Sequence, residues 1–164
     1  MFIVAYHSKY FKRNYLDCDV RPSGTSKPLW EVVNKKTVAD EAYYLDPSNK
    51  YYQMIRKLAD VEGADRLYQV RRVEIRACPT DTCPTLTANM GGGGHNVPFV
   101  VDDWGIRKLT EVECLALQGY NEMDVIFPPD ILQKDKYTMI GNAIYPGIAE
   151  KLIKEMEFSW ARGK

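Results

Sequence analysis

Residues 85–98 have the sequence Thr-Leu-Thr-Ala-Asn-Met-Gly-Gly-Gly-Gly-His-Asn-Val-Pro, the most unusual stretch of this 164-residue chain. They belong to a longer segment, residues 77–100, that has a single formal charge and strand-like sequence on both sides. Glycine gives the backbone access to conformations closed to other residues. Thr, Asn and His at close spacing around the glycines therefore predict a shaped loop and not a linker.

Regular elements are expected on both sides of this loop. Polar and apolar residues alternate in the segment 70–77, which predicts a half-buried strand. Thr110 and Glu113 form a capping-box pattern, so a helix should follow Thr110 and stop near Gly119. Nearer the start, apolar residues at 51, 54, 55 and 58 predict a helix. Residues 21–28 have the composition of a loop, and residues 29–33 that of a short helix or turn.

The two ends of the chain differ from this central part. Residues 2–6 are β-branched and aromatic, so we expect the chain to begin inside a strand. A last helix should begin near Asn142 and run to about Phe158, with one apolar face. Such a strand edge and such a helix face favour a partner that covers them.

Composition narrows the class of protein. Hydrophobic residues make up 45% and charged residues 27% of the chain, as in soluble globular proteins. No apolar run reaches the ~20 residues of a membrane span, and no signal peptide is recognisable. The formal net charge is zero, so any affinity for DNA must come from a local cluster of basic residues or from a partner.

The four cysteines, Cys18, Cys78, Cys83 and Cys114, follow no framework spacing and complete no zinc set with the two histidines. Without an export signal, we expect reduced thiols in a cytoplasmic protein. Each cysteine is interpreted as a small buried hydrophobic residue.

The loop at 85–98 and three later segments closely resemble the C-terminal third of the DNA cytosine-5 methyltransferases. The later segments are Arg107-x-Leu109-Thr110-x-x-Glu113, Leu117-Gln118-Gly119 and Gly141-Asn142-Ala143. The resemblance implies an α+β fold: a small target-recognition domain with a mostly β core, plus an N-terminal strand and a C-terminal helix that dock on a separate Rossmann-like catalytic domain. It assigns residues 1–20 to the strand and its lead-in, 21–135 to target recognition, and 136–164 to the final motif and helix.

The other motifs of the family do not occur in the sequence. There is no Pro-Cys dipeptide for the nucleophile, no Glu-Asn-Val and no Gly-x-Gly cofactor loop. The chain therefore resembles the recognition subunit of a split, two-polypeptide methyltransferase of a restriction–modification system. It should be inactive without a catalytic partner that carries these motifs, and the two would share S-adenosyl-L-methionine and act on double-stranded DNA, with no membrane partner. The alternatives are a non-enzymatic DNA-binding remnant of an interrupted methyltransferase gene and an unrelated interaction domain.

The resemblance implies DNA contacts in the glycine-rich loop. Thr85 would donate its hydroxyl to a phosphate, although a threonine in a turn can also bond its own backbone. Gly91 and Gly92 would let the backbone approach DNA and offer N–H groups to phosphates, or would simply make the loop flexible. Three further polar residues could reach base edges or phosphates: Asn89, His95 and Asn96.

Arg71, Arg72 and Arg76 precede the loop. Arginine can pair bidentately with guanine, so these residues could read sequence, or they could form a solvated strand face with Glu74 as counter-ion. In a single regular strand Arg71 and Arg76 would point to opposite faces. At least one of the three is therefore expected to be structural.

Asn142 and Ala143 are the expected cofactor-binding residues. The family's final motif lines the adenosylmethionine pocket, and Asn142 at a helix start would suit the cofactor's carboxylate or would act as a plain helix cap. The sequence departs from the family at Ala116, Asn121, Thr138, Met139 and Tyr145. These positions usually hold Arg, Pro, Lys, Gln and Pro respectively.

Overall fold

Four short antiparallel strands in the order β2-β1-β3-β4 form the sheet of the computed structural model. The structure describes residues 9, 27–71, 74–93, 96–121 and 125–162, with side chains described as far as residue 157. The strands are β1 (Tyr68–Arg71), β2 (Glu74–Ala77), β3 (Phe99–Val101) and β4 (Ile106–Lys108). Helices and a sheet occur together, which confirms the α+β class. The strand expected over residues 2–6 lies outside the described residues.

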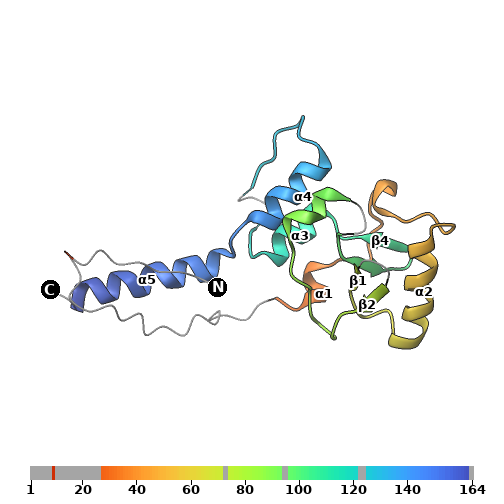
Figure 1. Cartoon of the computed structure of the whole chain (residues 1–164), viewed down its shortest axis with the longest axis horizontal. Helices are drawn as coiled ribbons and strands as arrows, with labels where there is room; N and C mark the ends of the chain where they lie inside the picture. The colour runs from red at the N-terminus through yellow and green to blue at the C-terminus, as the bar shows by residue number, and fades with distance from the viewer. Residues whose placement is uncertain (1–8, 10–26, 72–73, 94–95, 122–124, 163–164) are drawn as a thin grey trace. The chain divides into compact units, whose positions relative to one another are not determined.

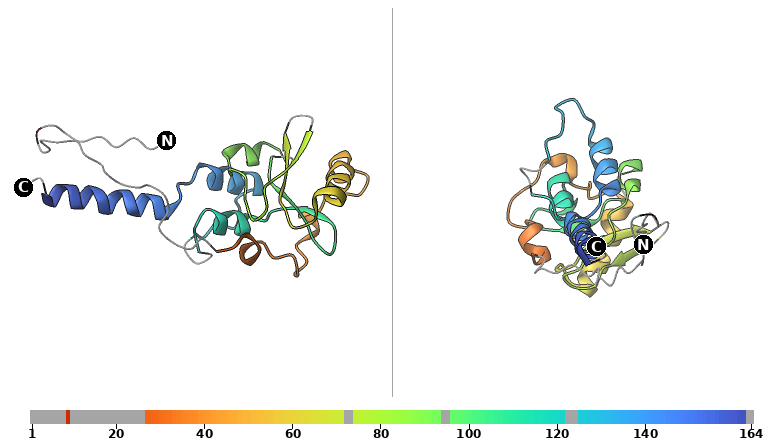
Figure 2. Two further views of the ribbon diagram at one scale, coloured as in Figure 1. Left: turned by 90° about the horizontal axis from the view of Figure 1, so that it is seen from below. Right: turned by 90° about the vertical axis from the view of Figure 1, so that its left-hand side faces the viewer.

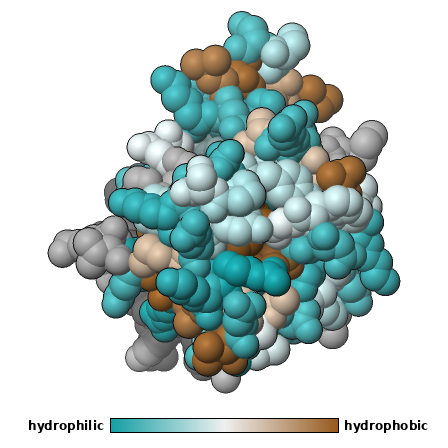
Figure 3. Space-filling model, turned by 90° about the vertical axis from the view of Figure 1, so that its right-hand side faces the viewer, coloured by the Kyte–Doolittle hydropathy of each residue, from teal (hydrophilic) through white to brown (hydrophobic). Residues whose placement is uncertain are grey.

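Helices cover both faces of the sheet (Figure 1). One face packs against α2 (Lys50–Glu62), whose Ile55 is buried against Tyr68 and Phe99. The outer side of the molecule at α2 is largely hydrophilic, with only scattered hydrophobic residues (Figure 3). The helix expected around residues 51–58 is thus confirmed, and the Asn49 side chain caps it by accepting from the N–H of Tyr51.

The second core lies on the opposite face of the sheet. Leu67, Val100 and Leu109 pack there against helices and the loop at 78–98. The elements involved are α1 (Leu29–Val32), η2 (Ala88–Gly92), α3 (Glu111–Leu117) and α4 (Gln133–Asn142). The neighbouring η1 (Glu41–Tyr43) leads to an isolated bridge between Tyr44 and Arg107, which extends the β4 edge. Because consecutive residues of β3 point to opposite faces, Phe99 joins the first core and Val100 the second.

The segment 70–77 is not one strand. It contains the end of β1 and the whole of β2, which pair as an antiparallel hairpin (Figure 2). Polar residues alternate with apolar ones on both arms, and the only break in that alternation is the consecutive pair Arg71-Arg72.

The last helix also differs from expectation. Asn142 ends α4, and the following helix α5 (Pro146–Arg162) begins four residues later. Proline is favoured at the first position of a helix because its missing N–H has no partner there. The chain divides into two compact units, residues 26–143 and residues 1–25 with 144–164. The assignment of functional domains to these parts stays a prediction.

Candidate functional site

The glycine-rich loop is held by two buried side chains and presents polar ones. Leu86 and Met90 are buried in the second core, and the N–H of Met90 donates to the carbonyl of Thr87 at 3.0 Å to start η2. Thr85 and Asn89 are exposed on the same segment. Within the described part of the chain neither side chain makes a hydrogen bond, so both are available to a ligand.

Two glycines allow η2 and α4 to cross closely. A Cβ at Gly91 would lie 2.0 Å from Oγ1 of Thr138 and 2.3 Å from the carbonyl oxygen of Lys134. A Cβ at Gly141 would lie 2.0 Å from the carbonyl carbon of Thr87. No heavy atom lies within 4 Å of a Cβ built at Gly92. Gly91 therefore serves the helix crossing, whereas exposed Gly92 faces open space.

The hairpin places Arg71 and Arg76 on one face. Arg76 pairs with Gln69, and Arg71 with Glu74, in the antiparallel register. Directly paired residues share a face, as do residues two apart on one strand, so both arginines lie on the face of Gln69. The expectation that they point to opposite faces was wrong, because it assumed one continuous strand.

Both guanidinium groups on this face are exposed. Nε of Arg71 donates to Oε1 of Gln69 at 2.9 Å, and Arg76 makes no hydrogen bond or ion pair among the described residues. Glu74 forms no ion pair with either arginine there. Glu74 lies directly opposite Arg71 in the register of the hairpin, so its role as a local counter-ion stays a prediction. The hairpin and the loop share the second core through Leu67, Cys78, Leu86 and Met90.

Arg107, unlike Arg71 and Arg76, is buried and bound to carboxylates. It is 1% exposed, and its two terminal nitrogens donate to the two carboxylate oxygens of Glu113, each at 2.8 Å. Its Nε donates to Oδ2 of Asp102 at 2.9 Å, and Nη2 to the carbonyl of Asn34 at 2.9 Å. Burial works to lower the pKa of Arg107, but the bonds and charges of Glu113 and Asp102 outweigh it and raise that pKa.

The same glutamate completes the expected helix cap. The N–H of Thr110 donates to Oε2 of Glu113 at 2.8 Å, and the Thr110 hydroxyl accepts from the N–H of Glu113 at 3.2 Å. The capping box at α3 is thus confirmed. The segment from Arg107 to Glu113 joins β4, α3 and Asn34, two residues after the end of α1, so it acts as a scaffold.

The helix end at Asn142 has the wrong polarity for the expected anion site. Asn142 is exposed and Ala143 half-buried where α4 ends. The last turn of a helix presents carbonyl oxygens, which attract positive groups, whereas a carboxylate favours the first turn. The expectation of a helix N-terminus at Asn142 was therefore wrong.

The described cysteines are unsuited to nucleophilic chemistry. Burial raises the pKa of Cys78 and that of Cys114, and it raises the pKa of Cys83 to about 12. A thiol with a raised pKa yields little thiolate at neutral pH. Cys78 and Cys114 are buried, which confirms their interpretation as small buried hydrophobic residues, whereas Cys83 is only half-buried and Cys18 lies outside the described residues. No group of metal-ligating side chains occurs in the described part of the chain.

Of the three remaining expected site residues, the structure describes only Asn96. Arg72 and His95 lie outside the described residues. Asn96 is half-buried, and its N–H donates to the carbonyl of Gly93 at 3.1 Å.

Sequence reasoning also missed α4, which carries Gly141 and supports the loop. The hydroxyl of Tyr137, on this helix, donates to the carbonyl of Leu109 at 2.6 Å. The three-residue spacing of buried Tyr137 and Ile140 was the only local signal for this helix.

Comparison with known proteins identifies the family. The model of the family described as C-5 cytosine-specific DNA methylase matches residues 9–157, nearly the whole chain. The chain belongs to the C-5 cytosine-specific DNA methylase family. This confirms the resemblance drawn from the sequence motifs.

Two curated proteins share clear similarity with the chain. Type II methyltransferase M.Bsp6I of Bacillus sp. (strain RFL6) is 38% identical over 121 residues, which are 71% of this chain and 37% of that protein. Type II methyltransferase M.NlaIV of Neisseria lactamica is 44% identical over 66 residues, 40% of this chain and 14% of that protein. The chain thus spans little more than a third of the first relative. No solved structure gives a significant match.

Proposed function

We propose that this chain is the DNA-recognition subunit of a DNA (cytosine-5-)-methyltransferase in a restriction–modification system. A single combination of observations carries the proposal. The family model matches residues 9–157, yet the 164 residues contain no Pro-Cys dipeptide. The nucleophile that attacks C6 of cytosine would therefore come from a catalytic partner polypeptide, and this chain alone would be inactive.

The chemistry of the cysteines supports the need for a partner. Covalent attack on cytosine requires a thiolate next to a group that holds the base. Burial disfavours the thiolate of Cys78, Cys83 and Cys114 alike. In the proposed complex the partner flips the base out of the duplex and supplies the thiolate, and this chain selects the DNA site.

The exposed face of the hairpin would read base edges. Arg71 and Arg76 lie on one face, exposed, and without a carboxylate partner among the described residues. A free guanidinium can form two parallel hydrogen bonds to O6 and N7 of guanine. Gln69 on the same face holds Arg71 at 2.9 Å, which fixes the direction of that side chain. A guanine-containing recognition sequence follows from this arrangement.

The loop would hold the DNA backbone next to that face. Thr85 and Asn89 have exposed side chains without protein partners in the described region, and Gly92 leaves its backbone open. Hydroxyl, amide and backbone N–H groups bind phosphate oxygens and position the duplex. Arg72, His95 and Asn96 remain further proposed contacts, and Gly91 would contribute by fixing η2 against α4.

The cofactor S-adenosyl-L-methionine would be shared with the partner. We propose that Asn142 and Ala143 line its pocket, as the family's final motif suggests. The carbonyl-rich end of α4 fits the ammonium group of the cofactor better than its carboxylate. The cofactor would supply the transferred methyl group. Asn142 would orient it through its amide, and half-buried Ala143 would limit access of water.

The setting of the proposed enzyme is the cytoplasm, where its substrate is double-stranded DNA. None of the helices in the described part of the chain is long and apolar enough to cross a membrane. The three described cysteines are free thiols.

Methyl transfer in a reconstituted mixture tests the proposal. Methyl-labelled S-adenosyl-L-methionine and mixed-sequence duplex DNA are incubated with this chain, with the catalytic polypeptide encoded by the adjacent reading frame, or with both. We expect label in 5-methylcytosine only when both proteins are present. A mixture containing Thr85→Val should methylate more slowly, whereas Val61→Ala, a change at an exposed residue outside the candidate site, should have no effect.

Two results would contradict this function. Methylation by the chain alone would show that it carries its own nucleophile. DNA binding without methylation in the mixture, with both proteins folded, would favour the non-enzymatic remnant instead.

A further inference from the structure

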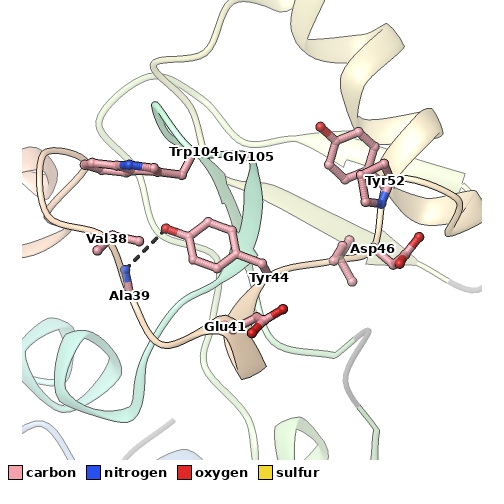
Figure 4. A pocket seen from close by; sticks show the side chains of 10 residues that line it. Val38, Ala39, Glu41, Tyr44, Asp46, Tyr52, Trp104 and Gly105 are labelled. Carbon is pink, nitrogen blue, oxygen red and sulfur yellow. Dashed lines mark hydrogen bonds between the residues drawn. The ribbon is translucent and has the colours of Figure 1, made fainter.

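A hollow of about 450 Å³ opens between the loop at residues 38–47, the start of α2 and the turn that joins β3 to β4. Three aromatic side chains, Tyr44, Tyr52 and Trp104, line it together with the carboxylates of Glu41 and Asp46 (Figure 4). The volume suits a small organic ligand or one long side chain. None of the proposed DNA or cofactor residues contributes to its wall.

The Tyr44 side chain and the backbone of the turn that carries Trp104 are anchored before any ligand arrives. The hydroxyl of Tyr44 donates to Oδ2 of Asp102 at 2.9 Å and accepts from the N–H of Ala39 at 3.3 Å. Oδ1 of Asp102 accepts from the N–H groups of Trp104 and Gly105, at 3.0 and 2.9 Å. One buried aspartate thus anchors both Tyr44 and the turn that presents Trp104, and a preorganised wall saves the cost of ordering it on binding.

Trp104 belongs to neither of the two hydrophobic cores. It is 50% exposed at the tip of a tight turn, although a tryptophan is the side chain that gains most from burial. In Figure 4 its ring borders the hollow on the side across from Tyr44, and Tyr52 forms a third side. An exposed tryptophan beside two tyrosines offers several electron-rich ring faces to one bound group.

The charges around the hollow favour a positively charged ligand. Glu41 and Asp46 line it, and no lysine or arginine does. Hydrogen bonds from the side chain and backbone of Ser48 lower the pKa of Asp46, so this carboxylate is ionised at neutral pH. Phosphates of DNA would be repelled here, whereas a cation would be attracted by the carboxylates and by the ring faces together.

We propose that this hollow is a binding site for an organic cation of the alkylammonium class, with Trp104, Tyr44 and Tyr52 around the cationic head and Glu41 and Asp46 as its counter-charges. The cation can be a free small molecule or the side chain of a lysine, since both carry a positive charge on an alkyl-substituted nitrogen. The site does not depend on the proposed function in DNA methylation, because it uses a separate set of residues.

Titration of the full chain followed by NMR tests the site. The probes are choline, its uncharged carbon isostere dimethylbutanol, and a short peptide with one lysine. The indole N–H signal of Trp104, assigned by its loss in Trp104→Phe, reports binding, and that of Trp30 serves as the internal reference. We expect choline to shift the Trp104 signal saturably. The uncharged isostere should bind at least about tenfold more weakly.

Variants separate the aromatic and the charge contributions. Trp104→Ala should abolish saturable shifts at the remaining pocket signals, and Glu41→Gln with Asp46→Asn should weaken choline severalfold. Val61→Ala, at an exposed residue outside the hollow, is the control and should leave binding unchanged. Saturation by the lysine peptide alone would identify a protein side chain as the ligand, and saturation by choline a free cation, so either supports the site. Equal binding of dimethylbutanol, no saturable shift with either cation, or binding retained in Trp104→Ala would overturn it.

Discussion

Two sets of arginines in one sheet have opposite surroundings. Arg107 on β4 is buried, and its three side-chain nitrogens make three hydrogen bonds to two carboxylates and two to main-chain carbonyls. Arg71 and Arg76 on the hairpin are exposed, and their only described side-chain partner is neutral Gln69. The first arrangement leaves nothing for a ligand to bind, while the second leaves two guanidinium groups available. Residue type alone therefore does not distinguish a frame residue from a recognition residue, but its partners do.

Removing Arg107 should have the largest effect on stability. Arg107→Met would leave Glu113 and Asp102 buried without a counter-charge, which costs about 3–5 kcal/mol. Urea unfolding followed by circular dichroism measures the loss. Arg71→Met is the matched control on the same sheet, and it should change stability by less than about 0.5 kcal/mol. Similar losses of unfolding free energy in the two variants would contradict the proposed difference between the buried and the exposed arginines.

The next effect concerns DNA. Arg76→Ala should cost about 1–3 kcal/mol of discrimination between the preferred sequence and one lacking its guanine, while the unfolding midpoint stays constant. Competition binding by the reconstituted methyltransferase measures it. Thr85→Val is the companion variant, and it should weaken all sequences alike because a phosphate contact carries no sequence information.

Gly91 and Gly92 show the same difference between a packed and an exposed position within one loop. Gly91→Ala should destabilise by about 1–3 kcal/mol, because its methyl group would overlap Thr138 and Lys134 of α4. Gly92→Ala meets no atom within 4 Å, so its stability should change by less than about 0.5 kcal/mol. Thermal unfolding of both variants tests this. A larger loss at Gly92 than at Gly91 would contradict the assigned crossing of η2 and α4.

A smaller effect is expected from Cys83. Burial raises its pKa from 9.0 to about 12, so the folded state keeps the thiol protonated where the unfolded state loses its proton. This contribution to stability is complete below pH 9 and is lost as the pH rises towards 12. In the native protein Cys83 should react with iodoacetamide far more slowly than in urea at pH 8.

Only part of this molecule could be predicted from its sequence. The helix α2 and the capping box at Thr110 and Glu113 follow from local patterns, and the structure has both. The hairpin was not predicted because polar and apolar residues alternate along both of its arms, and only the consecutive pair Arg71-Arg72 breaks that pattern. The helix α4 is specified by contact with η2, about 45 residues earlier in the chain, and its own apolar pattern is weak.

The candidate site, too, could be predicted only in part from the sequence. The family motifs point to the loop at 85–98 and to the arginines before it. Which arginine has free hydrogen-bonding groups depends on the register of β1 and β2, and which glycine is open depends on α4. Both are non-local properties. The hollow beside Trp104 is assembled from three separate segments and has no motif in the sequence.

The most direct test of the division between frame and recognition face is one binding measurement on a double variant. Arg71→Ala with Arg76→Ala is combined with the proposed catalytic partner, and its DNA affinity is measured against that of the unchanged pair, with its unfolding midpoint as the check on folding. Our account predicts at least about a tenfold loss of affinity for the preferred sequence with no shift in the midpoint. Unchanged affinity in a folded double variant would show that the hairpin face does not bind DNA.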